Sequence, residues 1–164
     1  FSISTWIKTQ NSQTQIIAEK NDWYSIPNWN NLKNYMLYTS SSDGKIHFIS
    51  HCSNPNDGTS KEVLSSSGVI DNEWYYVTAT RGKDSNNNFI KSVYINGILE
   101  DQEIDQSCIS YTTIEPLYIG VRNESNTYMG TLLKFYYTGQ MDEFIIFNRS
   151  LTQQEIQQIY LSQK

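Results

Sequence analysis

Three large aromatic side chains, Trp23, Tyr24 and Trp29, stand close together among asparagine and serine residues in the segment 21–30. The C–H face of a sugar ring packs on an aromatic ring, and amide side chains such as Asn30 bond its hydroxyls. The segment therefore predicts a carbohydrate-binding site. The alternative is that Trp23 and Trp29 close one end of the hydrophobic core. Secondary ligand-binding candidates come from neighbouring loops: Arg81, Arg122, Asn123 and Tyr128.

A pair of carboxylates on one strand face would indicate a different chemistry, glycoside hydrolysis. Retaining enzymes need two carboxyl groups about 5–5.5 Å apart. Glu103 and Asp105 begin such a pattern, but no second glutamate follows where it would be needed. Segment 100–105 is therefore interpreted as a solvated strand edge or loop. Asp142 and Glu143 are adjacent, so they are expected to point to opposite faces of their strand. No catalytic residue is predicted.

The two histidines, His47 and His51, would share one strand face, and Cys52 follows them. This spacing suits metal ligands, but the sequence holds no third histidine and no further ligand nearby, so ordinary sheet positions are favoured. The sequence also lacks a Ser-His-Asp elbow, a phosphate-binding glycine loop and a zinc motif. These features together indicate a protein that is not an enzyme.

Length and charge narrow the class of protein further. The chain has 164 residues, which fits one domain, and a net charge of -5. This acidic balance makes a nucleic-acid partner unfavourable. No apolar run approaches the roughly 20 residues that span a bilayer, so direct membrane insertion is not expected.

Two kinds of covalent modification are suggested by the sequence. Cys52 and Cys108 are the only cysteines, and they are equally compatible with one disulfide or with two free buried thiols. Asn123 and Asn148 each begin an Asn-x-Ser sequence, which is the pattern of N-glycosylation acceptors.

Many short strands separated by polar loops must position these side chains. Asp43-Gly44 and Asn96-Gly97 are turn dipeptides between apolar segments, and both predict hairpins. Such a pattern favours an antiparallel sandwich or barrel. Trp6 and Trp74 fall in regular strands and are expected in the core.

The end of the chain predicts a short helix. Thr152 can be its N-cap, and Glu155 three positions later completes a capping box. Leu151 and Ile156 suit a hydrophobic staple across the helix start. Ile156, Ile159 and Tyr160 then form an apolar stripe at helical spacing.

The order of these motifs resembles the laminin-G-like, concanavalin A-like lectin/glucanase jelly-roll family. The resemblance covers essentially the whole chain and rests on the segments FSISTWIK, IIAEK, WYYVTATRGK, VYINGIL, PLYIG and TGQMDEFIIFNRSLTQQEIQQIY. Family members usually carry one more strand before the first segment. Segments 21–34 and 123–137 look elaborated. The resemblance implies an all-β, two-sheet antiparallel jelly-roll sandwich with a short C-terminal helix, and residues 1–164 as one domain excised from a larger multidomain protein.

The resemblance also implies a recognition or adhesion module that is extracellular or on the cell surface. Carbohydrate is the commonest ligand implied. The alternatives are an extracellular protein ligand, bound by a structural module beside other domains of the same parent chain, and a glycoside hydrolase. Related domains often hold calcium, which implies Asp142 as a ligand with Asp22 as its partner. The competing interpretation is that Asp142 only accepts turn N–H groups.

Overall fold

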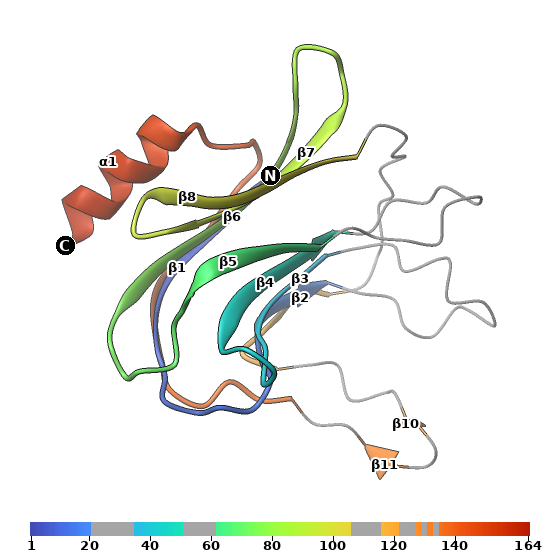
Figure 1. The fold of residues 1–164 in the computed structure, drawn as a ribbon, viewed down its shortest axis with the longest axis vertical. Helices are drawn as coiled ribbons and strands as arrows, with labels where there is room; N and C mark the ends of the chain where they lie inside the picture. Colours follow the sequence, from blue (N-terminus) through green and yellow to red (C-terminus); the bar gives the residue numbers. More distant parts are fainter. Residues whose placement is uncertain (21–34, 51–61, 106–115, 122–126, 129–130, 133–134) are drawn as a thin grey trace.

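Two five-stranded antiparallel sheets lie face to face in the computed structural model (Figure 1). The structure describes residues 1–20, 35–50, 62–105, 116–121, 127–128, 131–132 and 135–164. The first sheet has the order β12 (Gln140–Phe147), β1 (Ser2–Lys8), β6 (Tyr75–Lys83), β7 (Phe89–Ile95) and β8 (Ile98–Asp105). The second has the order β5 (Glu62–Gly68), β4 (Lys45–Ser50), β3 (Tyr35–Thr39), β2 (Gln15–Lys20) and β9 (Tyr118–Ile119). A small pair, β10 (Thr127–Tyr128) and β11 (Thr131–Leu132), stands apart.

The main core fills the space between the two sheets. Alternation along β1 sends Ile3 and Ile7 inward, where both are fully buried. Val77 and Val93 from the same sheet meet Phe48 from the second sheet in one apolar cluster. The expected two-sheet antiparallel sandwich is therefore confirmed.

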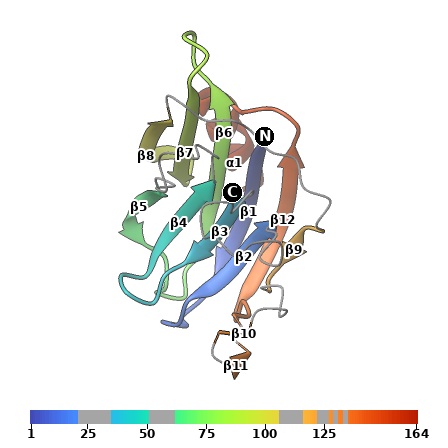
Figure 2. The ribbon, with the colours of Figure 1, turned by 90° about the vertical axis from the view of Figure 1, so that its right-hand side faces the viewer.

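A second, smaller core lies on the outer face of the first sheet, beneath α1 (Gln153–Gln163). Figure 1 shows the first sheet between α1 and the second sheet, and Figure 2 shows α1 behind the strands. Tyr76, Leu151 and Ile156 are buried here, and Trp6 and Tyr160 pack against them. This is the only helix in the described part of the chain, and it is neither long nor apolar enough to cross a membrane.

The start of α1 matches its prediction. The Thr152 side chain accepts a hydrogen bond from the Glu155 N–H, and the Glu155 carboxylate accepts one from the Thr152 N–H. The Arg149 guanidinium also donates to Glu155, at 2.7 and 2.9 Å. The hydrogen bond from Arg149 has the largest effect on the pKa of Glu155, and the hydrogen bond from the Thr152 N–H has the next largest. Together they lower this pKa to about 2. The capping box is therefore present and further braced by an arginine.

Both hairpins predicted from dipeptides are present. β3 and β4 pair around Asp43-Gly44, and β7 and β8 pair around Asn96-Gly97. Asn96 and Gly97 have φ angles of 53° and 79°, which is the left-handed conformation that a type I′ turn requires. The Asn96 side chain also accepts the Tyr76 N–H at 2.9 Å, so the turn is tied to the neighbouring strand.

Carboxylates close the side of the sandwich where the sheet edges β5 and β8 meet. Glu100 of β8 accepts hydrogen bonds from the backbone N–H groups of Ser66 and Ser67 of β5, at 2.9 and 3.2 Å. Asp101 accepts the Leu64 N–H at 3.0 Å. Segment 100–105 is thus the edge strand of its sheet, as the sequence suggests, and its acids satisfy donors of the opposite edge.

Candidate ligand-binding pocket

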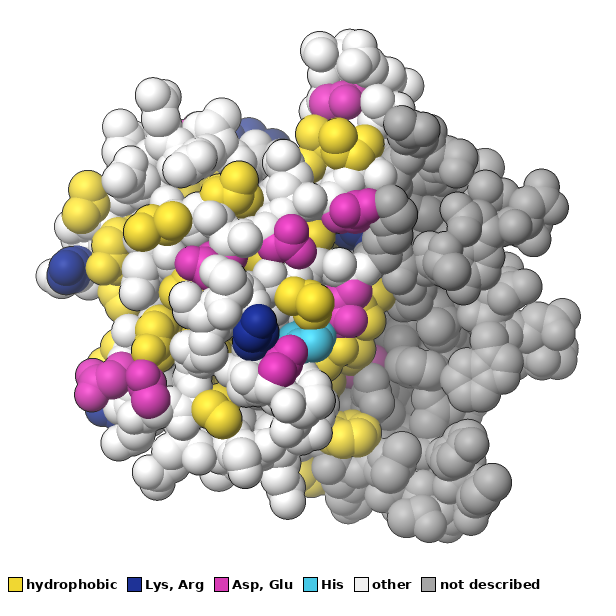
Figure 3. Space-filling model, viewed as in Figure 1, with side chains coloured by type: hydrophobic (Ala, Val, Ile, Leu, Met, Phe, Trp, Pro, Cys, Tyr) yellow, Lys and Arg dark blue, Asp and Glu magenta, His cyan; other side chains and the backbone are white. Residues whose placement is uncertain are grey.

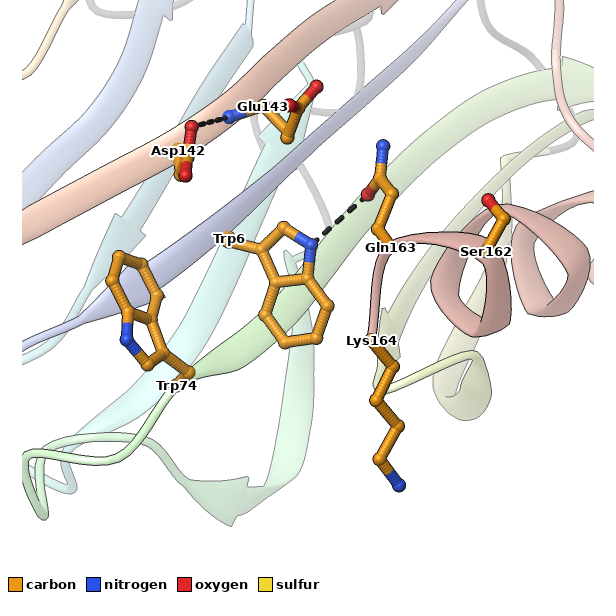
Figure 4. A pocket seen from close by; sticks show the side chains of 7 residues that line it. All are labelled: Trp6, Trp74, Asp142, Glu143, Ser162, Gln163 and Lys164. Atoms are coloured by element: carbon orange, nitrogen blue, oxygen red, sulfur yellow. Dashed lines mark hydrogen bonds between the residues drawn. The ribbon is translucent and has the colours of Figure 1, made fainter.

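An open pocket of ≈ 540 Å³ lies between the first sheet and the last turn of α1 (Figure 4). The sheet contributes its outer face, and the helix contributes its C-terminal residues. Two indoles lie between two carboxylates on the β12 side and three polar side chains on the helix side. The lining residues are Trp6, Trp74, Asp142, Glu143, Ser162, Gln163 and Lys164.

Trp6 is the fixed indole of this pocket. Its ring centroid lies 5.4 Å from that of Tyr76 and 5.6 Å from that of Tyr160. Its Nε1–H donates to Gln163 Oε1 at 3.1 Å, the bond drawn in Figure 4. Contacts from the sheet and from the helix therefore hold the indole in one orientation, half-buried at the pocket wall.

Trp74 is the exposed indole. It directly precedes β6, and 39% of its surface is accessible to solvent. The prediction that Trp6 and Trp74 belong to the core holds for Trp6, which packs against the smaller core beneath α1, and is wrong for Trp74, which contributes to neither core. Strand alternation places Trp6 and Tyr76 on the outer face, and alternation alone does not reveal whether a helix covers that face. Tryptophan at an open pocket wall offers a large apolar surface for a ligand.

A β-bulge in β12 brings two carboxylates to this pocket. Ser4 pairs with Ile145 and Trp6 with Asp142, so β12 carries one residue more than β1 over this interval. The φ angle of Glu143 is 49°, in the left-handed region that non-glycine residues rarely adopt. Because of the bulge, Asp142 and Glu143 line the same pocket, which corrects the expectation that they point to opposite faces.

The pocket presents hydrogen-bonding groups of both kinds. Asp142 Oδ1 accepts the Glu143 N–H at 2.8 Å. The Ser162 hydroxyl donates to the Ile159 carbonyl oxygen at 2.8 Å. The Lys164 ammonium lies 5.7 Å from the Tyr160 ring centroid, close enough for a cation–π contact. Acceptors on the sheet side thus face donors on the helix side, with aromatic surface between them.

Most residues predicted to bind ligand from the sequence lie outside the described residues. This applies to the aromatic segment and its neighbours and to both cysteines, so their roles remain predictions. The residues concerned are Trp23, Tyr24, Trp29, Asn30, Arg122, Asn123, Asp22, Cys52 and Cys108.

Three further predicted residues are at least partly described. Arg81 lies near the end of β6, with its guanidinium carbon 4.6 Å from the Phe89 ring centroid. Arg81 is seven positions beyond Trp74, which corresponds to about 23 Å of strand, so Arg81 is remote from the pocket. Tyr128 is described only as backbone in β10. Asn148 is exposed directly after β12, and its glycosylation remains a prediction.

The calcium prediction depends on Asp142 and Asp22. Asp142 accepts the Glu143 N–H, which is the competing interpretation of this residue. No group of three acidic, histidine or cysteine side chains suited to a metal is found among the described residues, and calcium takes 6–8 oxygen ligands. Since Asp22 lies outside the described residues, the calcium site stays a prediction.

A second polar cluster surrounds His47 on the outer face of the second sheet. His47 Nε2 lies 3.1 Å from Asp43 Oδ1, and Nδ1 lies 3.0 Å from Glu62 Oε1. The Tyr38 hydroxyl donates to Glu62 at 2.6 Å. Figure 3 shows a histidine side chain (cyan) beside acidic side chains (magenta) on this side of the molecule. Each imidazole nitrogen faces a different carboxylate, so these three residues form a chain of ion pairs. His51 and Cys52, the other members of the metal alternative, lie outside the described residues.

The signal that could have revealed the pocket is the spacing of apolar residues in β12. Met141 and Phe144 both pack against the main core although they are three positions apart. Regular alternation with a period of two cannot place both on one face, so an extra residue between them is required. That extra residue is the bulge that brings Glu143 to the pocket. The wall formed by α1 has no comparable sequence signal.

A family model described as the concanavalin A-like lectin/glucanases superfamily matches residues 1–157. The chain therefore belongs to this superfamily, and the predicted laminin-G-like jelly-roll fold is confirmed. No relative is found among curated proteins.

Several solved structures share the fold. The receptor binding domain of the botulinum neurotoxin C/D mosaic serotype matches 99% of this chain with a TM-score of 0.64 and 21% identity. The binding domain of Paraclostridial Mosquitocidal Protein 1 matches 99% with a TM-score of 0.65 and 15% identity. A Bacteroides ovatus protein, provisionally named a carbohydrate binding protein, matches 96% with a TM-score of 0.68 and 12% identity. The chain covers 36%, 37% and 39% of these structures, respectively.

Proposed function

We propose that this domain is a non-catalytic carbohydrate-recognition module of a secreted or cell-surface protein, and that it binds its glycan in the pocket of Trp6 and Trp74. Sugars offer an apolar C–H face and a rim of hydroxyls. The proposed binding mode packs the C–H face on the indole of Trp74 and pairs the hydroxyls with the polar lining.

The exposed position of Trp74 beside an immobilised Trp6 carries this proposal. An indole that is 39% exposed leaves apolar surface in water, which a ligand would cover. Aromatic contact with the carboxylates, amide and hydroxyl of the same lining matches the mixed surface of a sugar. A volume of ≈ 540 Å³ falls within the range of about 300–1,000 Å³ typical of small-ligand sites.

The related structures support a recognition role at a coarser level. Two of them are binding domains of toxins, and one is provisionally named as a carbohydrate binding protein. A toxin's receptor-binding domain also supports the second candidate, a protein ligand. In that case Trp74 would act as an aromatic anchor of a protein interface.

Substitution of Trp74 by alanine tests the glycan proposal. We expect Trp74→Ala to weaken glycan binding at least tenfold, because a stacking aromatic is worth about 1.4 kcal/mol or more. Its melting temperature should stay close to that of the wild type, since the side chain is outside both cores. A glycan array followed by calorimetric titration of the bound sugars measures the effect. Tyr136→Ala, which removes an exposed aromatic outside the pocket lining, is the matched control.

Three results would contradict the proposal in different ways. Equal sugar binding by Trp74→Ala and the wild type would show that the sugar does not bind in this pocket. Loss of sugar binding in Trp23→Ala or Trp29→Ala would then assign the sugar site to segment 21–34. Capture of a protein partner with no sugar bound on the array would favour the second candidate. Release of shortened oligosaccharides by the wild-type domain would show that it is an enzyme.

A further inference from the structure

We infer that Glu143 is the specificity-determining residue of the pocket and that it selects uncharged glycans over acidic ones. This inference rests on the proposed function. It concerns a residue that contributes to neither hydrophobic core and whose backbone adopts an unfavourable conformation.

The packing of β12 requires the bulge itself. Met141 and Phe144 both pack against the main core, and only an extra residue between them reconciles their three-residue spacing with the strand period. The Thr5 hydroxyl donates to the Asp142 carbonyl oxygen at 3.0 Å, which ties the bulged segment to β1. The backbone at Glu143 is therefore determined by its neighbours.

That backbone does not require a glutamate. A φ angle of 49° is accessible to glycine without steric cost, whereas a side chain with a Cβ is strained there. The Glu143 side chain is exposed, so it gains little from packing. Strained residues of this kind cluster at ligand sites. The property that glutamate adds at this position is its carboxylate on the pocket wall.

The carboxylate gives the pocket its charge preference. Asp142 and Glu143 contribute two negative charges to the lining, and Lys164 contributes one positive charge. Asp142 Oδ1 already accepts a backbone N–H, and within the described part of the chain the Glu143 carboxylate has no hydrogen-bond partner. Carboxylate oxygens accept hydrogen bonds from hydroxyls, but they repel the carboxylate or sulfate of an acidic sugar. Glu143 therefore favours a neutral sugar over its acidic counterpart.

The test compares Glu143→Gln and Glu143→Gly on matched pairs of neutral and sialylated or sulfated oligosaccharides. The wild type should bind the neutral member at least tenfold more tightly. Glu143→Gln keeps the shape but loses the charge, so this ratio should fall to about threefold or less. The wild-type ratio should also shrink between about 20 mM and 500 mM salt, because ions screen the repulsion.

Glu143→Gly separates a ligand role from a purely structural one. The variant should melt at a higher temperature than the wild type, because glycine relieves the strained φ angle, yet bind the neutral glycan at least fivefold more weakly. Asn87→Gly is the matched control. Asn87 has a φ angle of 66° in the loop between β6 and β7 and does not line the pocket, so this change should not alter glycan binding.

Two results would overturn the inference without touching the proposed function. One is unchanged neutral-glycan affinity in Glu143→Gly together with a higher melting temperature, which would make Glu143 a turn residue only. The other is a wild-type preference for acidic glycans that Trp74→Ala abolishes. Absence of any glycan binding by the wild type would instead refute the proposed function, and the inference with it.

Discussion

At the scale of single residues, the His47 cluster illustrates how burial and charge oppose each other. Burial lowers the pKa of His47, but the hydrogen bonds and charges of Glu62 and Asp43 outweigh burial and leave the pKa raised. Burial raises the pKa of each carboxyl group. A hydrogen bond from the Lys45 N–H to Asp43, and hydrogen bonds from His47 to both carboxylates, outweigh this effect. The pKa values of Asp43 and Glu62 are therefore lowered. The folded state therefore favours the fully ionised cluster.

This cluster predicts a specific dependence of stability on pH. The raised pKa of His47 stabilises the fold below pH ~6.5, and this contribution is lost as pH rises through the higher folded value. The lowered pKa values of Asp43 and Glu62 stabilise it above pH ~4, and this contribution is lost as pH falls through their folded values. The contribution should therefore be greatest near pH ~5–6.

Urea denaturation of the wild type and of His47→Gln at pH ~5.5 and ~8.5 measures the contribution of the His47 cluster to stability. We expect His47→Gln to cost about 0.5–1 kcal/mol more at the lower pH, a value kept small because both carboxylates are about 30% exposed. An equal cost at both pH values would contradict the assignment of charge to His47.

Residue types alone predicted some of the chemistry at this scale. Asp142 was identified as a candidate ligand, but as a calcium ligand, and its place beside Trp6 depends on the register between β1 and β12. Trp74 was expected in the core because a strand pattern does not say which face a helix will cover. His51 lies outside the described residues, whereas His47 lies in a strand as predicted. Its two carboxylate partners come from another strand and a turn, whose approach only the fold determines.

At the scale of elements, the β7–β8 hairpin and α1 fit together through one glycine. A Cβ on Gly97 would lie 3.1 Å from the Gln157 Cα of the helix, and its φ angle is 79°. Asn96-Gly97 was predicted as a turn from local sequence, and it is one. The close contact with α1 is a tertiary constraint that the dipeptide does not reveal, so the glycine serves two purposes.

Gly97→Ala should therefore destabilise the domain by about 1–2 kcal/mol. The added methyl group would strain the left-handed backbone and push against the helix. Gly68→Ala in β5 is the control, because its φ angle is not positive and its nearest atom, the Gly44 carbonyl oxygen, is 3.6 Å away. Urea denaturation monitored by tryptophan fluorescence distinguishes the two variants. Equal losses in both would show that the contact with α1 contributes nothing.

At the scale of the whole molecule, the two sheet edges on one side protect each other. An edge strand exposes unpaired N–H groups that can pair with another chain. Here Glu100 and Asp101 of β8 accept the N–H groups of Leu64, Ser66 and Ser67 in β5. The alternating pattern and the turn dipeptides predicted the two-layer fold. They did not predict this closure, because the partners are more than thirty residues apart.

Removal of this closure should affect both folding and association. We expect Glu100→Ala to lower the free energy of unfolding by about 1–2 kcal/mol, because the two β5 N–H groups that it pairs with would lose their acceptor. It should also increase self-association through the uncovered edge. Urea denaturation and sedimentation velocity measure the two effects. Glu73→Ala removes the same charge from an exposed loop and should change neither, so equal behaviour of the two variants would contradict the role of Glu100.

Because β12 carries one additional residue, the lining of the pocket depends on the length of this strand as well as on the identity of its residues. Removing one codon at position 143 would restore strict pairing along β1, and Met141 and Phe144 would then be two positions apart and still face the main core. Asp142 would still pair with Trp6 on the outer face, but the pocket would lose the carboxylate of Glu143. A homologue one residue shorter in this strand could therefore keep the same interior and still present a different recognition surface. Strand length at this point is therefore a simple criterion for deciding which homologues can share a ligand with this domain.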